Sequence, residues 1–584
     1  MKENWDLSVF YRGFDDPAFD ADLSSLPEQI EAARRAIGEE TGDEAGKLRS
    51  LISRLEDINA KAERLQLMIS LTLACDAENE AANAAMTPLM RAMMAYRQLG
   101  NAFSRYASTV DHLDTLIDGD EVLRANGFFL RRSAQAARHM LPGAIEEPVL
   151  RMQLSGGEMF SQLRDKLDAT LEIDFRGEKL PLSAVRALAY DADAATRREA
   201  YEAELAAYAR IELPMSYCLN AIKAEARTMA DLRGYDSVLA MTLDDSNMRA
   251  ETLEAMWSAI REALPELREY LKAKGRLLGH DKGLPFYDLF APLGGGRTYT
   301  AGEARALLLD VFGRFSPEMA DMMREAFDEG WIDLYPRAGK SGGAFCAGCY
   351  AQRISRVMTN FTGSLSDVST LAHELGHAFN NRMLERVPVL MTSTPMPLAE
   401  TASTFNETVL AAELRRHASA GEELALLDAS LTENIQTMVD IYSRFLFEQK
   451  VVDSQADHAM SVRELKDAML WAQEQSYGDG LDPDARHPYM WACKSHYYST
   501  EAHFYNFPYA FGNLFARGLY ARYRQEGEAF VPRYGELLSR FGSDTIENVA
   551  AGAGIDVTQP AFWRDAVESV LEEVRRFVQL ADRH

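Results

Sequence analysis

The spacing of apolar residues is the feature that most restricts how this chain can fold. In the first 170 or so residues, apolar side chains recur at alternating steps of four and three, and the clearest run is Leu51, Leu55, Ile58, Ala62, Leu65 and Ile69. Such a period places the apolar positions on one face of an α-helix. The pattern resumes from Leu182 to about Leu278 and again after Thr300. We therefore predict a mainly α-helical protein, and we assign these stripes to helix packing.

Two segments interrupt the helical pattern with strand-like alternation. Residues 170–182 alternate apolar and polar positions about Arg176-Gly177, which predicts a β-hairpin and a boundary between residues 1–180 and 181–584. Residues 342–361 are rich in Gly, Cys, Val and Phe and predict two short strands of a small sheet. Gly294-Gly295-Gly296 predicts a turn.

Charge and composition exclude several classes of partner. The 584 residues carry a formal charge of −27, which repels nucleic acid and anionic membrane surfaces. The opening residues show no basic segment followed by an apolar stretch, and no run reaches the length of a membrane span. Five scattered cysteines fit a reducing compartment. We expect a cytoplasmic protein without nucleic-acid or membrane partners; its oligomeric state is left open.

His373-Glu374-Leu375-Gly376-His377 matches the pattern H-E-x-x-H. On a helix, residues four apart project from the same face, so the two imidazoles can bind one Zn²⁺. Glu374 follows about 100° round the helix, where its carboxylate can reach a metal-bound water. Ser364 and Asp367 resemble a capping box, and this supports a helix here. The alternative is a pair of buried structural histidines, which would be costly to desolvate.

A catalytic zinc needs a third protein ligand, and the His and acidic residues downstream are the candidates. Glu400 opens another helical segment after a loop that contains Pro388, Pro395 and Pro397. Glu407 lies seven residues further on the same face and could orient a ligand imidazole, although an ordinary helix-surface role is equally consistent with the sequence.

The segments around this motif resemble the oligoendopeptidase F group of the thimet oligopeptidase family. The similarity extends over residues 362–372, residues 399–407 and the opening Trp5-Asp6-Leu7. It implies a zinc peptidase with Glu400 as third ligand, and a large helical ellipsoid with a deep substrate channel. Residues 1–180 would form a helical N-terminal lobe and residues 181–584 the catalytic domain.

The resemblance also implies a His and a Tyr that donate hydrogen bonds to the tetrahedral intermediate. Both His496 and His503 precede Tyr509; the spacing of thirteen residues favours His496, and Pro508 should turn the Tyr509 phenol toward the channel. Tyr505 lies one turn away and could assist, and His503 is the competing candidate or a packed side chain.

We therefore expect a zinc metalloendopeptidase that cleaves short, unfolded oligopeptides. A predicted edge strand at Gly343 and Ala344 would pair with an extended peptide backbone. An exopeptidase and a non-catalytic peptide-binding scaffold are the alternatives. Cys346 and Cys349 form a C-x-x-C pair without a second Cys pair or a thioredoxin-like pattern, so we assign them no role.

Overall fold

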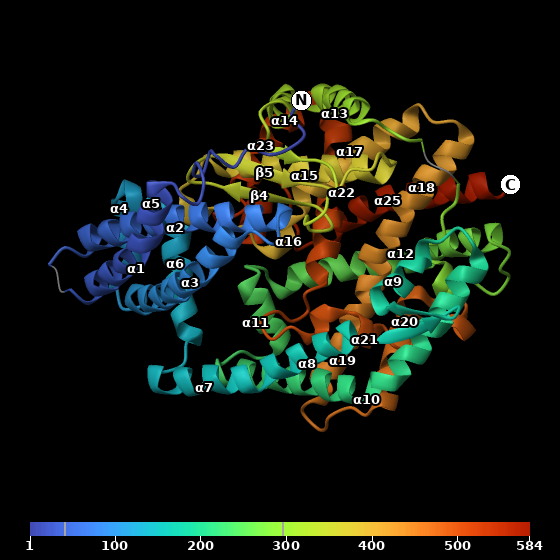
Figure 1. Cartoon of the computed structure of the whole chain (residues 1–584), viewed down its shortest axis with the longest axis horizontal. Coiled ribbons are helices and arrows are strands. Elements are labelled where there is room, and N and C mark those ends of the chain that lie inside the picture. Colours follow the sequence, from blue (N-terminus) through green and yellow to red (C-terminus); the bar gives the residue numbers. More distant parts are fainter. Residues whose placement is uncertain (40–41, 295–296, 584) are drawn as a thin grey trace.

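The computed structural model describes residues 1–39, 42–294 and 297–583, and helices make up most of it (Figure 1). The predicted mainly α class is confirmed. None of the described helices is both long enough and apolar enough to cross a membrane. Gly295 and Gly296 of the predicted turn lie outside the described residues.

The N-terminal helices build most of one hydrophobic core, whose buried residues run from Phe10 to Leu130 and include Cys349 from later in the chain. Each of the six apolar positions of the predicted stripe in α2 is buried. These helices are α1 (Pro17–Gly38), α2 (Glu44–Cys75), α3 (Glu80–Ala107), α4 (Leu113–Gly119), α5 (Glu121–Ala125) and α6 (Gly127–Ala136). A second core includes buried residues from Leu171 to Ala581. The predicted division at residue 180 stays a prediction.

The predicted hairpin follows α7 (Gly143–Ser155) and α8 (Gly157–Ala169). Strands β1 (Glu172–Phe175) and β2 (Glu178–Pro181) pair antiparallel around Arg176 and Gly177. Both turn residues have positive φ, 52° and 85°, as a two-residue type I′ turn requires. The hairpin prediction is confirmed.

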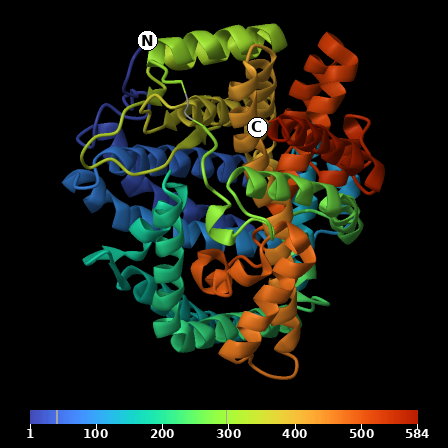
Figure 2. The same ribbon diagram turned by 90° about the vertical axis from the view of Figure 1, so that its right-hand side faces the viewer.

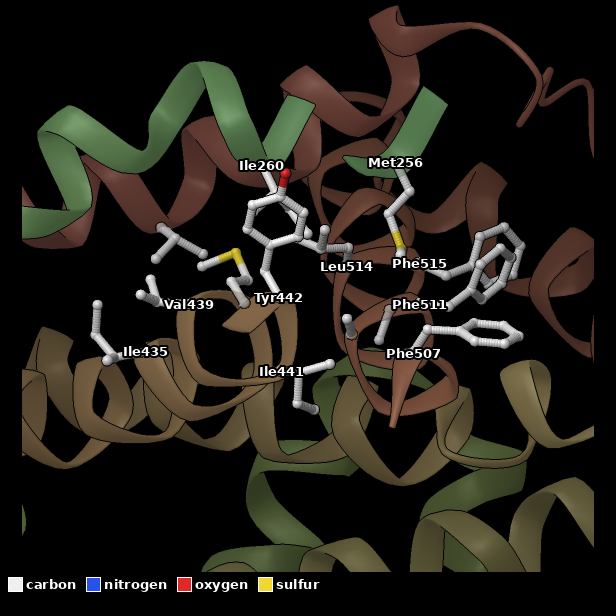
Figure 3. Close-up of a cluster of buried hydrophobic side chains, with 14 of the residues drawn as sticks. Met256, Ile260, Ile435, Val439, Ile441, Tyr442, Phe507, Phe511, Leu514 and Phe515 are labelled. Carbon is white, nitrogen blue, oxygen red and sulfur yellow. The ribbon is translucent and has the colours of Figure 1, made fainter. Parts of the chain in front are cut away.

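Helices of the second half surround the larger core. They are α9 (Leu182–Ala187), α10 (Ala194–Leu232), α11 (Val238–Asp245), α12 (Ala250–Leu277), α13 (Ala301–Phe315), α14 (Pro317–Asp328), α15 (Leu365–Leu384), α16 (Met396–Ala399), α17 (Thr401–Arg416), α18 (Ala420–Asn434), α19 (Ile441–Ser454), α20 (Val462–Tyr477), α21 (Met490–Cys493), α22 (Phe507–Glu526), α23 (Phe530–Ser539), α24 (Ile546–Gly552) and α25 (Pro560–Ala581). Between α18 and α19 the chain forms a π-helical segment, η5 (Ile435–Asp440). Figure 3 shows α12, η5, α19 and α22 meeting through buried side chains such as Ile260, Val439 and Leu514.

A three-stranded sheet lies beside α15 (Figure 1), and the sequence predicts two of its three strands. Its strands are β3 (Ile332–Asp333), β4 (Phe345–Cys349) and β5 (Ile354–Met358), in the order β3-β5-β4. Strand β5 runs parallel to β3 and antiparallel to β4. Strand β4 is therefore an edge strand; it begins at Phe345, one residue after Ala344.

The N-terminal segment rests on this sheet. The carbonyl of Asp6 accepts a hydrogen bond from Nε of Arg356 in β5 at 2.9 Å, and the rings of Trp5 and Phe345 have centroids 6.3 Å apart. Figures 1 and 2 both show the N-terminus beside the α13–α14 pair. The opening Trp-Asp-Leu sequence therefore belongs to the surroundings of the α15 sheet.

Candidate metal centre and active site

A complete capping box fixes the start of α15, as the sequence predicts. The backbone N–H of Asp367 donates to Oγ of Ser364 at 3.1 Å, and Oδ2 of Asp367 accepts from the backbone N–H groups of Ser364 and Thr362 at 3.0 and 2.9 Å. Burial tends to raise the pKa of Asp367, but these donors outweigh it and lower that pKa. A charged carboxylate at a helix N-terminus is also favoured by the helix dipole.

Three potential metal-binding groups converge where α15 meets α17. Nε2 of His373 and Nε2 of His377 lie 3.3 and 3.4 Å from Oε2 of Glu400. Ligand atoms that are each about 2.0–2.1 Å from a tetrahedral zinc stand roughly 3.3 Å apart. The His–Glu separations therefore fit one such ion. The three side chains are about a quarter exposed, so the centre remains accessible.

Close helix packing brings Glu400 to the two imidazoles. Glu400 lies between α16 and α17, and Oγ of Ser403 donates to its Oε2 at 3.0 Å. A Cβ atom at Gly376 would lie 2.6 Å from the carbonyl oxygen of Ala402, and one at Gly512 would lie 3.1 Å from Cβ of Glu400. These two glycines thus allow α15 and α22 to pack closely against the backbone around Glu400.

The carboxyl group of Glu374 is directed into a nearly closed environment. The residue is 5% exposed, and its Oε2 atom has no hydrogen-bond partner among the described residues. Burial raises its pKa, while the neighbouring His373 and His377 act in the opposite direction. An unpartnered carboxylate oxygen beside the imidazole pair fits a group that holds a reacting water.

Glu407 contacts the far side of one imidazole. Its Oε1 lies 3.3 Å from Nδ1 of His373, so the ring of His373 bridges Glu407 and Glu400. Burial tends to lower the pKa of His373, but the two carboxylates outweigh it and raise that pKa to about 11. A carboxylate on the second nitrogen of a histidine is a common way to orient a metal ligand. Glu407 also lines a cavity of about 400 Å³.

Tyr509 lies on α22 next to Glu400. Gly512, one turn further along α22, contacts Glu400, and the negative charge of Glu400 contributes to a raised pKa of the Tyr509 phenol. Burial is the largest cause of that increase, followed by the hydrogen bond with Tyr505. The two phenol oxygens are 3.4 Å apart. Pro508 occupies the first turn of α22, where its missing N–H costs no hydrogen bond.

His496 lies on a short 3₁₀ turn, η8 (Ser495–Tyr498), in a positively charged environment. Burial and the charges of Arg444 and Lys494 lower its pKa to about 2. Its imidazole is therefore neutral at ordinary pH, and its buried Nε2 has no hydrogen-bond partner among the described residues. The charge of Arg444 also acts to lower the pKa of Tyr509, but burial and the other causes outweigh it. No direct contact joins His496 to the His–His–Glu groups in the described part of the chain.

His503 belongs to a buried ion-pair network. It is 5% exposed, and its Nδ1 lies 3.4 Å from Nζ of Lys223. Lys223 in turn contacts Oε1 of Glu448 at 2.6 Å. Since an ammonium group only donates, Nδ1 of His503 acts as the acceptor. These contacts favour the structural interpretation of His503.

Gly343 and Ala344 lie just before β4, outside the strand. The carbonyl of Gly343 accepts a hydrogen bond from Nδ2 of Asn360 at 2.9 Å, and Ala344 is half-buried. Cys346 and Cys349 are free thiols; Sγ of Cys346 lies 3.6 Å from Nδ2 of Asn381. Among the described residues, neither cysteine belongs to a group that could hold a metal ion.

Sequence reasoning missed the residues that position Glu400. Ser403 lies within residues 399–407, where the sequence gives it no evident role, and Gly376 is an unspecified position within H-E-x-x-H. Asn406 donates from its side chain to the carbonyl of Ala372 at 3.0 Å and ties α17 to α15. A glycine inside a helix next to a ligand histidine is the one signal that could have suggested a close helix crossing.

A helical fold with H-E-x-x-H on a buried helix, and a glutamate from the junction of the next two helices, defines a class of peptidase. The chain belongs to peptidase family M3, whose family model matches residues 187–292 and 313–569. Group B oligopeptidase PepB of Streptococcus agalactiae serotype III (strain NEM316) is 25% identical, over 99% of this chain and 96% of its own length. An oligoendopeptidase F homolog of Lactococcus lactis subsp. lactis (strain IL1403) is 24% identical, over 99% of this chain and 98% of its own length.

Solved structures share the fold. A candidate peptidase from Chlamydophila abortus has a TM-score of 0.85 at 22% identity and covers 99% of this chain and 98% of its own. Oligoendopeptidase-F from Enterococcus faecium has a TM-score of 0.70 at 19% identity, and the match covers 97% of this chain and 99% of that structure's chain. The helical architecture is therefore that of known peptidases over nearly the whole chain.

Proposed function

We propose that this chain is a zinc-dependent metalloendopeptidase that hydrolyses internal bonds of short, unfolded oligopeptides in the cytoplasm. The observation that carries the proposal is the convergence of His373, His377 and Glu400 at separations that suit a tetrahedral ion. Membership of peptidase family M3 and the oligopeptidase names of its relatives support it. The proposed catalytic domain is residues 181–584, with residues 1–180 as a helical lobe.

His373, His377 and Glu400 would hold the zinc, leaving its fourth position open. Bound zinc would polarise the scissile carbonyl and lower the pKa of a water molecule. Glu407 would keep the His373 ring in the orientation that directs Nε2 toward Glu400, by accepting a hydrogen bond from Nδ1.

Glu374 would take a proton from the attacking water and pass it to the leaving amine. Its unpartnered Oε2 and its raised pKa suit a group that alternates between base and acid. Neutral His496 and Tyr509 would donate hydrogen bonds to the developing oxyanion, with Tyr505 supporting the Tyr509 phenol. His503 would have only a structural role.

The edge of β4 that no other described strand pairs with would bind the substrate backbone. An extended peptide could add to this edge next to Gly343 and Ala344 and form main-chain hydrogen bonds. Such binding gives affinity with little dependence on side chains, as suits a broad-range oligopeptidase.

Hydrolysis of an internally quenched peptide blocked at both ends tests this proposal. We expect cleavage at an internal bond that 1,10-phenanthroline abolishes. Cleavage only of peptides with a free terminus would favour the exopeptidase alternative. Peptide binding without any hydrolysis in a zinc-loaded protein would favour the non-catalytic scaffold.

A further inference from the structure

A buried ion pair lies next to the segment that carries the predicted oxyanion donors. Nζ of Lys223 in α10 contacts Oε1 of Glu448 in α19 at 2.6 Å, and both side chains are almost fully buried. Taking two charges out of water commonly costs more than their attraction returns, and apolar residues of similar size often give equal or greater stability. Stability alone therefore does not account for a pair at this depth.

The ion pair holds the backbone of one turn, formed by His503 and Phe504. Oε1 of Glu448 also accepts a hydrogen bond from the backbone N–H of Phe504 at 3.0 Å. Nδ1 of His503 accepts from Nζ of Lys223 at 3.4 Å, and the carbonyl of His503 accepts from Oγ1 of Thr242 in α11 at 3.2 Å. Side chains from three helices therefore converge on the 503–504 turn.

Phe504 needs this support because of its backbone conformation. Its φ is 52°, in the left-handed region that residues other than glycine seldom occupy. Such a conformation persists only where its surroundings impose it, and it is enriched near functional sites. The buried ring of Phe504 also packs against Phe445 of α19, with 5.4 Å between the ring centroids. The hydrogen bonds and the packed ring thus fix a conformation that the chain would not keep by itself.

The 503–504 turn leads into the helix that packs against Glu400. Tyr505 directly follows Phe504, and its phenol oxygen lies 3.4 Å from that of Tyr509 in α22. Gly512 comes three residues after Tyr509, and a Cβ atom there would lie 3.1 Å from Cβ of Glu400. Direct contacts therefore connect the turn to the proposed zinc ligand.

We propose that Lys223, Glu448 and Thr242 are positioning residues, which hold the 503–504 turn so that the phenols of Tyr505 and Tyr509 are preorganised to stabilise the oxyanion. They act through the backbone of the turn rather than by contact with the substrate. Donors that are fixed before the reaction lower its barrier, whereas a displacement of about 1 Å costs about a hundredfold in rate. This inference rests on the proposed function and gives the buried pair a role in it.

Two double variants that differ in one hydrogen-bond acceptor test the inference. Both remove the two charges, but Lys223→Met/Glu448→Gln keeps an amide oxygen that can accept from the Phe504 N–H, and Lys223→Met/Glu448→Leu does not. We expect the Gln variant to keep kcat within severalfold of the wild type and the Leu variant to lose about ten- to a hundredfold. KM and zinc content should stay near wild type in both. Equal kcat values for the two variants would overturn the inference.

Lys274 and Asp428 provide a matched control. They form another buried ion pair at 3.0 Å, between α12 and α18. Their hydrogen bonds to Tyr270, Leu289 and Thr432 lie outside the 503–504 turn and α22. Lys274→Met/Asp428→Leu should therefore keep the wild-type kcat. A loss of kcat as large as in the Leu variant would show a general effect of removing buried charges, and it would overturn the inference.

Thr242→Val tests the other side of the turn with little change to the fold, because valine has nearly the shape of threonine and Thr242 is half-buried. We expect a severalfold lower kcat with unchanged KM. Affinity for a phosphinic peptide, a stable analogue of the tetrahedral intermediate, should fall by a similar factor. Unchanged kcat in folded, zinc-loaded Thr242→Val protein would overturn the inference even if a double variant did not fold.

Hydrogen exchange distinguishes failure of this inference from failure of the proposed function. A wild-type protein that cleaves no peptide would contradict the proposed function. The Phe504 amide should still exchange about tenfold faster in the Leu double variant than in the Gln double variant, because its protection requires only the hydrogen bond to residue 448. Equal exchange rates at Phe504 in the two variants would overturn the inference whether or not the protein cleaves peptides.

Discussion

Replacing Gly376 with alanine should damage the metal centre without removing any ligand. The added Cβ would lie 2.6 Å from the carbonyl oxygen of Ala402 and 2.8 Å from Cα of Ser403. An ordinary contact begins at 3.4 Å, so α15 and α17 must separate by up to about 0.8 Å. Metal sites tolerate ligand distances only within roughly 0.2 Å of the ideal values.

This displacement acts directly on Glu400, which precedes the two contacted residues by two and three positions. We expect zinc affinity to fall about ten- to a hundredfold, as for changes to residues that orient ligands. Overpacking should also lower the free energy of unfolding by about 1–3 kcal/mol. Competition with a zinc chelator gives the affinity, and chemical denaturation gives the stability.

Gly302→Ala is the matched control, because Gly302 lies in α13 and a Cβ there would meet no atom within 4 Å. It should leave zinc affinity unchanged and stabilise the protein slightly. Wild-type zinc affinity in Gly376→Ala protein would refute the argument that close packing of these helices sets the position of Glu400.

Further predictions address the ligand set, the oxyanion donors and the substrate. Glu400→Ala should lower zinc occupancy itself, measured by elemental analysis, and full retention of zinc would point to another ligand. His496→Ala and Tyr509→Phe should each lower kcat about a hundred- to a thousandfold with little change in zinc content or KM, and His503→Ala should do far less in a folded protein. If His503→Ala lowers kcat more than His496→Ala does, the roles assigned to the two histidines are wrong and must be exchanged. Peptides of limited length should be cleaved much faster than folded proteins in a length series, and equal rates would contradict a recessed site.

Local signals predicted the parts of the site that depend on short sequence distances. The Ser364–Asp367 capping box and the i, i+4 spacing of His373 and His377 fixed the helix and the face of the imidazole pair, and the structure has both. The hairpin at Arg176 and the sheet beside α15 also followed from local alternation. These features require no knowledge of the tertiary fold.

The remaining features depend on which helices meet. Sequence alone could not show that Gly376 and Gly512 lie on either side of Glu400, because the three residues come from separate elements. The surroundings of His503 likewise depend on Lys223, 280 positions away.

The most direct test of the account measures zinc content and peptide hydrolysis together in Glu374→Gln protein. The substitution keeps the size of the side chain and leaves His373, His377 and Glu400 unchanged. We predict one zinc per chain, as in the wild type, and a rate lower by about a hundred- to ten-thousandfold, because proton transfer is lost. A metal-replete Glu374→Gln protein that cleaves peptides at the wild-type rate would contradict the central claim.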